Sequence, residues 1–143
     1  MGSVGVDLVV VQTLKRIPVN GGDVMHAMKI TDERYKGFGE AYFSWVNRGA
    51  VKAWKLHKEM TLNLIVPLGE VKFVFTSPDE PGKFRTEYIG TSNYARVTVP
   101  PGLWFGFSGL AEQNLVVNIA NIIHEPTESL KEVLSYFDFD WSI

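Results

Sequence analysis

The feature that most constrains the fold is a succession of short apolar runs separated by turn signals. One run, Leu62 to Leu68, ends at the break Pro67-Leu68-Gly69, and a second run, Glu70 to Phe75, follows it. The next segment, Ser77 to Lys83 (SPDEPGK), is the strongest turn signal in the chain, because proline restricts φ and glycine frees it. Other strand-like runs cover Ala41 to Val46, Ala95 to Val99 and Leu115 to Asn121. With 13 glycines and 7 prolines, this pattern predicts an all-β sandwich or barrel.

Only one segment favours a helix. Ser129 and Glu132 have the spacing of a capping box, and apolar residues recur behind them at helical intervals, namely Leu130, Val133, Leu134 and Phe137. We therefore expect one short C-terminal helix that covers one side of the β structure. No repeat or linker divides the 143 residues, so the prediction is a single domain over 1–143, with 1–8 as a loose N-terminal segment.

Charge and composition exclude several classes of protein. Fourteen basic against 16 acidic residues give a net charge of −2, and no basic cluster points to a nucleic-acid partner. No apolar run approaches the roughly 20 residues of a membrane helix, and the N-terminus lacks the features of a signal peptide. The absence of cysteine excludes disulfides and thiolate chemistry. We therefore expect a cytoplasmic protein without a nucleic-acid or membrane partner.

One pair of side chains suggests acid–base chemistry. In the segment KAWKLHK (52–58), a strand would place Lys55 and His57 on the same face, since side chains alternate along a strand. Each would be easier to deprotonate beside the other in a partly dry cavity, which prepares a general base near neutral pH. The alternative is a solvated basic strand end. His26 and His124 are interpreted as structural or surface residues.

The polar residues of the run NLVVNIANI allow two interpretations. Asn118 and Asn121 either bond to neighbouring backbone, or Asn118 lines a polar cavity, because buried amides must form hydrogen bonds. The chain contains no glycine-rich phosphate loop, no nucleophile elbow and no Cys/His zinc pattern, so these enzyme classes are excluded.

Two segments together resemble the paired motifs of the cupin superfamily. The first motif (G, five residues, H-x-H, three or four residues, E, six residues, G) matches Gly49, Lys55-Leu56-His57, Leu62 and Gly69 in spacing. The second (P-x-G, two residues, H, three residues, N) matches Pro100-Pro101-Gly102, Phe105 and Gly109. Of the three His and one Glu that bind metal in metal cupins, only His57 is present. One imidazole does not hold a catalytic divalent ion, so we expect a metal-free cupin.

Within that superfamily the chain is similar to the dTDP-4-dehydrorhamnose 3,5-epimerase family, which is itself metal-independent. The similar stretches are GFGEAYF, GAVKAWKLH, LIVPLGEVKFVF, VPPGLWFGFSGL and the final DW. The resemblance implies a jelly-roll β-sandwich, a homodimer, and a nucleotide-linked 4-keto-6-deoxysugar as substrate in surface polysaccharide or deoxysugar synthesis.

The resemblance also implies residue roles. Phe38 and Glu40 match the substrate-binding aromatic residue and Glu of the family, although Glu40 read alone would be a solvated residue. Lys52 stands where the family has a substrate-contacting Arg and lacks its bidentate fork.

The catalytic His of the family falls on Lys55 in an ungapped alignment and on His57 after a two-residue shift. Its general-acid Tyr falls on Asn118, which is kept as a substrate-binding candidate together with Trp104 of the VPPGLWFGFSGL stretch. The C-terminal extension that provides an Asp partner for the catalytic His is expected to be shortened.

Three functions follow as expectations. The first is cofactor-free epimerisation, in which Lys55 or His57 removes the proton next to the C4 ketone and Lys52 stabilises the enolate. The second is a 3,4-ketoisomerase, because those relatives have an H-x-H-K/R segment similar to Lys55-Leu56-His57-Lys58. The third is a non-catalytic protein that binds a sugar nucleotide or serves as the partner of another sugar enzyme.

Overall fold

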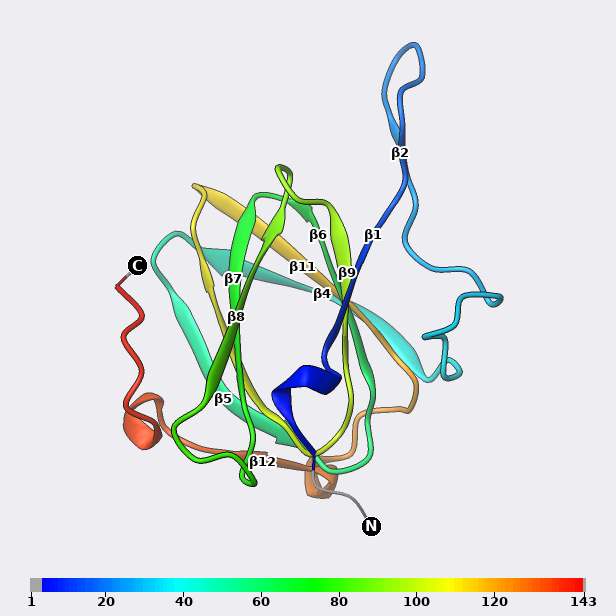
Figure 1. Cartoon of the computed structure of the whole chain (residues 1–143). Coiled ribbons are helices and arrows are strands. Elements are labelled where there is room, and N and C mark those ends of the chain that lie inside the picture. Colours follow the sequence, from blue (N-terminus) through cyan, green and yellow to red (C-terminus); the bar gives the residue numbers. More distant parts are fainter. Residues whose placement is uncertain (1–3, 143) are drawn as a thin grey trace.

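The computed structural model describes residues 4–142, which form two antiparallel sheets and a separate hairpin (Figure 1). The first sheet has the strand order β1 (Val10–Thr13), β9 (Ala95–Val99), β6 (Leu62–Leu68), β11 (Gln113–Ala120), β4 (Glu40–Asn47). The second has the order β12 (Ser129–Lys131), β5 (Val51–His57), β10 (Trp104–Gly109), β7 (Glu70–Thr76), β8 (Phe84–Gly90). The hairpin pairs β2 (Arg16–Ile17) with β3 (Val24–Met25). The predicted all-β sandwich is confirmed.

The main hydrophobic core lies between the two sheets. Val71, Phe73 and Phe75 of β7 alternate along the strand, and all three are fully buried in this core. Leu64 of β6 and Val97 of β9 join them from the other sheet. These three side chains form the inward face of β7, because successive side chains of a strand point to opposite faces of its sheet.

The break predicted at Pro67-Leu68-Gly69 is the turn between β6 and β7. Gly69 has φ +90°, and a Cβ atom there would lie 2.2 Å from the backbone oxygen of Gln113. Only glycine readily adopts a positive φ and also lacks a Cβ atom, so this turn requires glycine at position 69.

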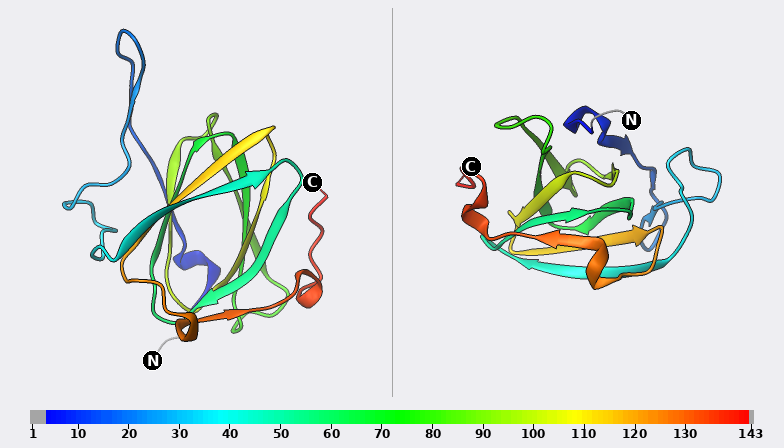
Figure 2. Two further views of the ribbon diagram at one scale, coloured as in Figure 1. Left: turned by 180° about the vertical axis from the view of Figure 1, so that it is seen from behind. Right: turned by 90° about the horizontal axis from the view of Figure 1, so that it is seen from below.

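The predicted C-terminal helix is wrong. Ser129 begins β12, which pairs antiparallel with β5, and only the 3₁₀ turns η2 (Pro126–Glu128) and η3 (Leu134–Tyr136) are helical here. Glu132 exchanges two backbone hydrogen bonds of 3.1 Å with Trp54, so the free edge of β5 outcompetes the local capping pattern. The expectation that this segment covers one side of the sheet is confirmed, since it runs along the outside of β5 (Figure 2).

The N-terminal segment is more ordered than the predicted loose stretch over 1–8, and the expectation needs correcting for residues 4–8. Val6 opens the 3₁₀ turn η1 (Val6–Leu8) and is buried in the main core. Backbone N–H groups of Val4 and Val6 donate to the carboxylates of Asp79 and Glu80. Residues 1–3 lie outside the described part of the chain. Within that part, no helix has the length and apolar character needed to cross a membrane.

Candidate active site

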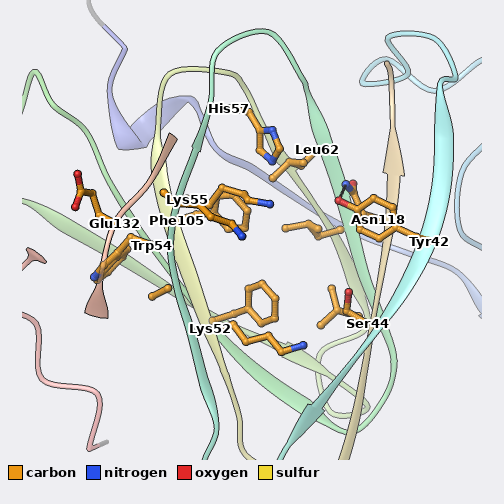
Figure 3. Close-up of a pocket in the computed structure, with 15 residues that line it drawn as sticks. Tyr42, Ser44, Lys52, Trp54, Lys55, His57, Leu62, Phe105, Asn118 and Glu132 are labelled. Atoms are coloured by element: carbon orange, nitrogen blue, oxygen red, sulfur yellow. Dashed lines mark hydrogen bonds between the residues drawn. The ribbon is translucent and has the colours of Figure 1, made fainter. Parts of the chain in front are cut away.

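A cavity of about 430 Å³ lies between the two sheets. One wall comes from β5 and β10, and the opposite wall comes from β4, β6 and β11 (Figure 3). Its principal apolar lining residues are Leu62, Leu64, Phe105, Phe107 and Val116. Its polar lining residues are Tyr42, Ser44, Lys52, Lys55, His57, Asn118, Lys131 and Glu132. The cavity thus combines apolar surface with several convergent polar groups, as small-molecule sites do.

Lys55 and His57 both face this cavity, as the alternation along their strand predicts. Burial lowers the pKa of Lys55, and the nearby ammonium of Lys131 lowers it further, against an opposing effect of Glu128. Burial also lowers the pKa of His57, and the charge of Lys55 adds to this, while Glu128 opposes it. The site therefore favours the neutral, proton-accepting form of each side chain.

His57 is held by a carboxylate that the sequence did not reveal. Its Nδ1 lies 2.7 Å from Oε1 of Glu128, and both side chains are buried. A neutral His57 that donates its Nδ1–H to Glu128 keeps its lone pair on Nε2, which is the arrangement of an oriented general base.

Glu128 is itself fixed by the backbone. Its Oε2 accepts hydrogen bonds from the N–H groups of Glu59 (3.0 Å) and Met60 (2.8 Å). Burial by itself would raise the pKa of Glu128, but the hydrogen bonds from His57, Glu59 and Met60 outweigh it and lower the pKa. The carboxylate is thus kept ionised behind His57. Glu128 immediately precedes β12, whose register with β5 pairs Ser129 with His57.

The opposite wall carries a phenol beside an amide. Asn118 and Tyr42 are direct partners across β11 and β4, and the Asn118 side-chain amide donates to the Tyr42 hydroxyl at 3.1 Å. The Asn118 oxygen accepts from the backbone N–H of Asn63. Both interpretations of Asn118 therefore hold, because it bonds to backbone and also lines the cavity. Tyr42, which the sequence reasoning missed, supplies a phenol next to the position where the resemblance implies one.

Three lysine side chains line the cavity. Lys52 and Lys55 come from β5, and Lys131 is the register partner of Lys55 on β12. Lys52 Nζ donates to the backbone oxygen of Trp45 at 2.8 Å, and among residues 4–142 no carboxylate lies within 4.0 Å of it. The acidic lining residue Glu132 lies beside Trp54 on the other side of β5 from Lys55 (Figure 3), so the basic lining suits an anionic ligand.

The positions that match the cupin ligand frame do converge in space. Lys55, His57, Leu62 and Phe105 all line the cavity, and the His57 ring stacks on that of Phe105 with centroids 6.0 Å apart. Within residues 4–142, no three or more His, Cys, Asp or Glu side chains are grouped so that they could hold a metal ion.

Three predicted substrate-binding residues lie elsewhere. Trp104 points to the outer side of its sheet, where it is buried against Tyr136 and Phe137, and its assignment needs correction. The alternation that aims Phe105 into the cavity aims Trp104 away from it. Phe38 and Glu40 are not among the cavity-lining residues either: Phe38 is 62% exposed, and Glu40 accepts a 3.4 Å hydrogen bond from the backbone of His124.

Several solved structures are similar to this chain. A dTDP sugar isomerase from Desulfovibrio desulfuricans is 31% identical, with a TM-score of 0.88, over 94% of this chain and 91% of that one. A dTDP-4-dehydrorhamnose 3,5-epimerase from Sulfolobus tokodaii is 22% identical (TM-score 0.81), over 99% and 86% of the two chains.

A 3,4-ketoisomerase from Thermoanaerobacterium thermosaccharolyticum, in complex with TDP-4-keto-6-deoxyglucose, is 17% identical (TM-score 0.74), over 87% of each chain. These last two likenesses show a shared fold. No protein-family model matches the chain, and no curated protein sequence matches it.

Proposed function

Because the chain belongs to the dTDP-4-dehydrorhamnose 3,5-epimerase-like family of dTDP-sugar epimerases and isomerases, we propose that it moves a proton next to the ketone of a dTDP-linked 4-keto-6-deoxysugar. Its fold is the cupin jelly roll of that family. The proposal includes a place in surface polysaccharide or deoxysugar synthesis. It also includes a cytoplasmic location, which the absence of cysteine supports.

The observation that carries this proposal is the buried pair of His57 and Glu128, which opens onto a cationic cavity. A general base must be unprotonated before it can remove a proton from the carbon next to a ketone. Burial lowers the pKa of His57 and so favours its unprotonated form at neutral pH. The ammonium group of Lys52, which also lines the cavity, stabilises the negative charge that develops as the proton is removed. Tyr42, on the opposite wall, returns a proton to the other face of the sugar, which inverts the carbon.

A ketoisomerase is the second candidate, and the placement of Lys55 and His57 supports it. Two residues apart on one strand, they are separated by about 6.7 Å along the same wall of the cavity. Acid–base groups side by side on one face suit transfer of a proton between neighbouring carbons, as 3,4-ketoisomerisation requires. Epimerisation instead uses groups on opposite faces.

The test is solvent-deuterium incorporation, followed by proton NMR, into a panel of dTDP-4-keto-6-deoxyhexoses. Deuterium at C3 or C5 with inverted configuration would identify an epimerase, and a carbonyl moved to C3 would identify a ketoisomerase. If every substrate binds but none exchanges, the proposal fails and the non-catalytic sugar-nucleotide-binding protein replaces it.

We propose that the active protein is a homodimer. The hairpin of β2 and β3 projects away from the two sheets (Figure 1), and it exposes Ile17, Val19 and Val24 by 40–50%. On the edge strand β4, Phe43 and Trp45 are 71% and 57% exposed. Exposed apolar groups on an arm and on a sheet edge support a contact with a second copy. Light scattering should give twice the 16.1 kDa of the chain, whereas a monomeric mass would refute the dimer.

A further inference from the structure

We propose that Lys55 acts as a nucleophile, which condenses with the ketone of the substrate to form a protonated imine, while His57 and Glu128 remove the neighbouring proton. This inference rests on the proposed function and assigns separate roles to the two side chains that face the cavity from β5. It makes the catalysis covalent.

The first support is that Lys55 and His57 differ in their partners. His57 has an orienting carboxylate at 2.7 Å, so it already forms a complete general base. Among the described residues, no carboxylate lies within 4.0 Å of the Lys55 ammonium and no acceptor bonds to it, whereas Lys52 and Lys58 each bond to a backbone oxygen. A free amine in the cavity suits attack on an incoming carbonyl better than relay of a proton.

The surroundings of the Lys55 amine also support its role as a nucleophile. Lys55 lies at the centre of three paired strands, with Phe105 opposite it on β10 and Lys131 opposite it on β12. Partial burial and the adjacent cation lower its pKa, and the opposing charge of Glu128 is engaged by His57 and two backbone N–H groups. Desolvation and a neighbouring cation are the two conditions that make a lysine amine nucleophilic at neutral pH.

The covalent step balances without an oxidant or a reductant. The Lys55 nitrogen lone pair attacks the carbonyl carbon, and the nitrogen proton passes to the carbonyl oxygen to give a carbinolamine. Loss of that hydroxyl as water leaves a C=N bond, which is protonated.

The positive nitrogen withdraws electrons from the adjacent carbon, so His57 takes its proton and an enamine forms. A proton returned to the enamine, followed by addition of water to the C=N bond, releases the product and restores Lys55.

Reductive trapping tests the inference. The protein is incubated with dTDP-4-keto-6-deoxyglucose and sodium cyanoborohydride, which reduces protonated imines faster than ketones, and its intact mass is measured. The expected mass gain equals the substrate minus one water plus two hydrogens, and peptide mapping places it on Lys55. Lys55→Arg, which keeps the charge but forms no imine, should reduce the adduct at least tenfold. Lys83→Ala, an exposed lysine away from the cavity, should trap as the unmodified chain does.

Solvent-deuterium exchange in parallel separates this inference from the proposed function. Exchange without any adduct, or an adduct mapped to another lysine, would overturn the covalent role of Lys55 and leave the function intact. A second readout is ¹⁸O exchange: each imine cycle replaces the ketone oxygen with solvent oxygen, so wild type should label the ketone faster than Lys55→Arg. Equal labelling rates would also overturn the inference. Absence of both exchange and adduct would overturn the function together with it.

Discussion

His57 is the residue on which the proposed chemistry depends, and its surroundings determine how the protein responds to pH. Burial lowers its pKa below the usual 6.5, so the unfolded chain binds more protons than the folded chain between that lowered value and about 6.5. Stability therefore rises with pH across this window and is lost on acidification through it.

We expect the free energy of unfolding to fall below pH 6.5 by no more than about 1.4 kcal/mol per pH unit for this one group. Urea denaturation between pH 5 and 8 measures this dependence, and His57→Gln should flatten it. The acidic limb of the exchange rate should likewise lie below pH 6.5. A His57→Gln variant with an unchanged pH dependence would show that another group titrates.

Replacing Glu128 by Gln tests the carboxylate behind His57. One amide oxygen cannot accept the hydrogen bonds from His57, Glu59 and Met60 as two carboxylate oxygens do. We expect the change to cost about 1–3 kcal/mol of stability, because buried donors lose their acceptor. The exchange rate should fall by about 10²-fold or more, because the orientation and charge behind His57 are lost. An unaltered rate in the folded variant would remove Glu128 from the mechanism.

Tyr42→Phe separates removal of the proton from its return. Without the phenol, His57 still exchanges the proton on its own face, so deuterium should enter the substrate while epimer formation falls by about 10²-fold. NMR of one reaction gives both rates. Tyr88→Phe, an exposed tyrosine of β8, is the matched control. Equal losses of exchange and epimer formation would contradict the assignment of Tyr42 as the acid.

Strand β12 brings Glu128 and Lys131 to the site. The sequence predicted a helix in this segment, which was the main error of the prediction. The spacing of Ser129, Leu130, Val133 and Phe137 is helical, yet the segment pairs with β5 and then packs aromatic side chains on Trp54. The spacing of apolar residues within a segment cannot show that a distant strand, here β5, has an unpaired edge with which the segment can form hydrogen bonds. By contrast, the alternation within β5 identified the shared face of Lys55 and His57 correctly, since that property is local to the strand.

Leu130→Pro tests the strand itself. Proline removes a backbone donor, so β12 should detach from β5, and Glu128 and Lys131 should leave the cavity with it. We expect a loss of at least about 1 kcal/mol of stability and an exchange rate as low as that of Glu128→Gln. Leu130→Ala keeps the ladder and should retain the wild-type rate, because this side chain is 44% exposed. If the proline variant exchanged at the wild-type rate, β12 would not be required.

At the scale of the whole molecule, the cavity joins positions that are distant in the sequence. The four positions that match the ligand positions of the two cupin-like motifs, Lys55, His57, Leu62 and Phe105, all line this cavity. Tyr42 and Glu128 escaped the prediction, since only the register of β4 on β11 and of β12 on β5 brings them to the cavity. Trp104 was misplaced because segment similarity does not say which face of a strand a residue occupies.

The most direct test of the account compares deuterium incorporation into the substrate by wild type and by the folded His57→Gln variant in single-turnover reactions. If His57 removes the proton beside the ketone, the rate should fall by 10²-fold or more, the contribution of a positioned general base. Incorporation by His57→Gln at the wild-type rate would contradict that claim.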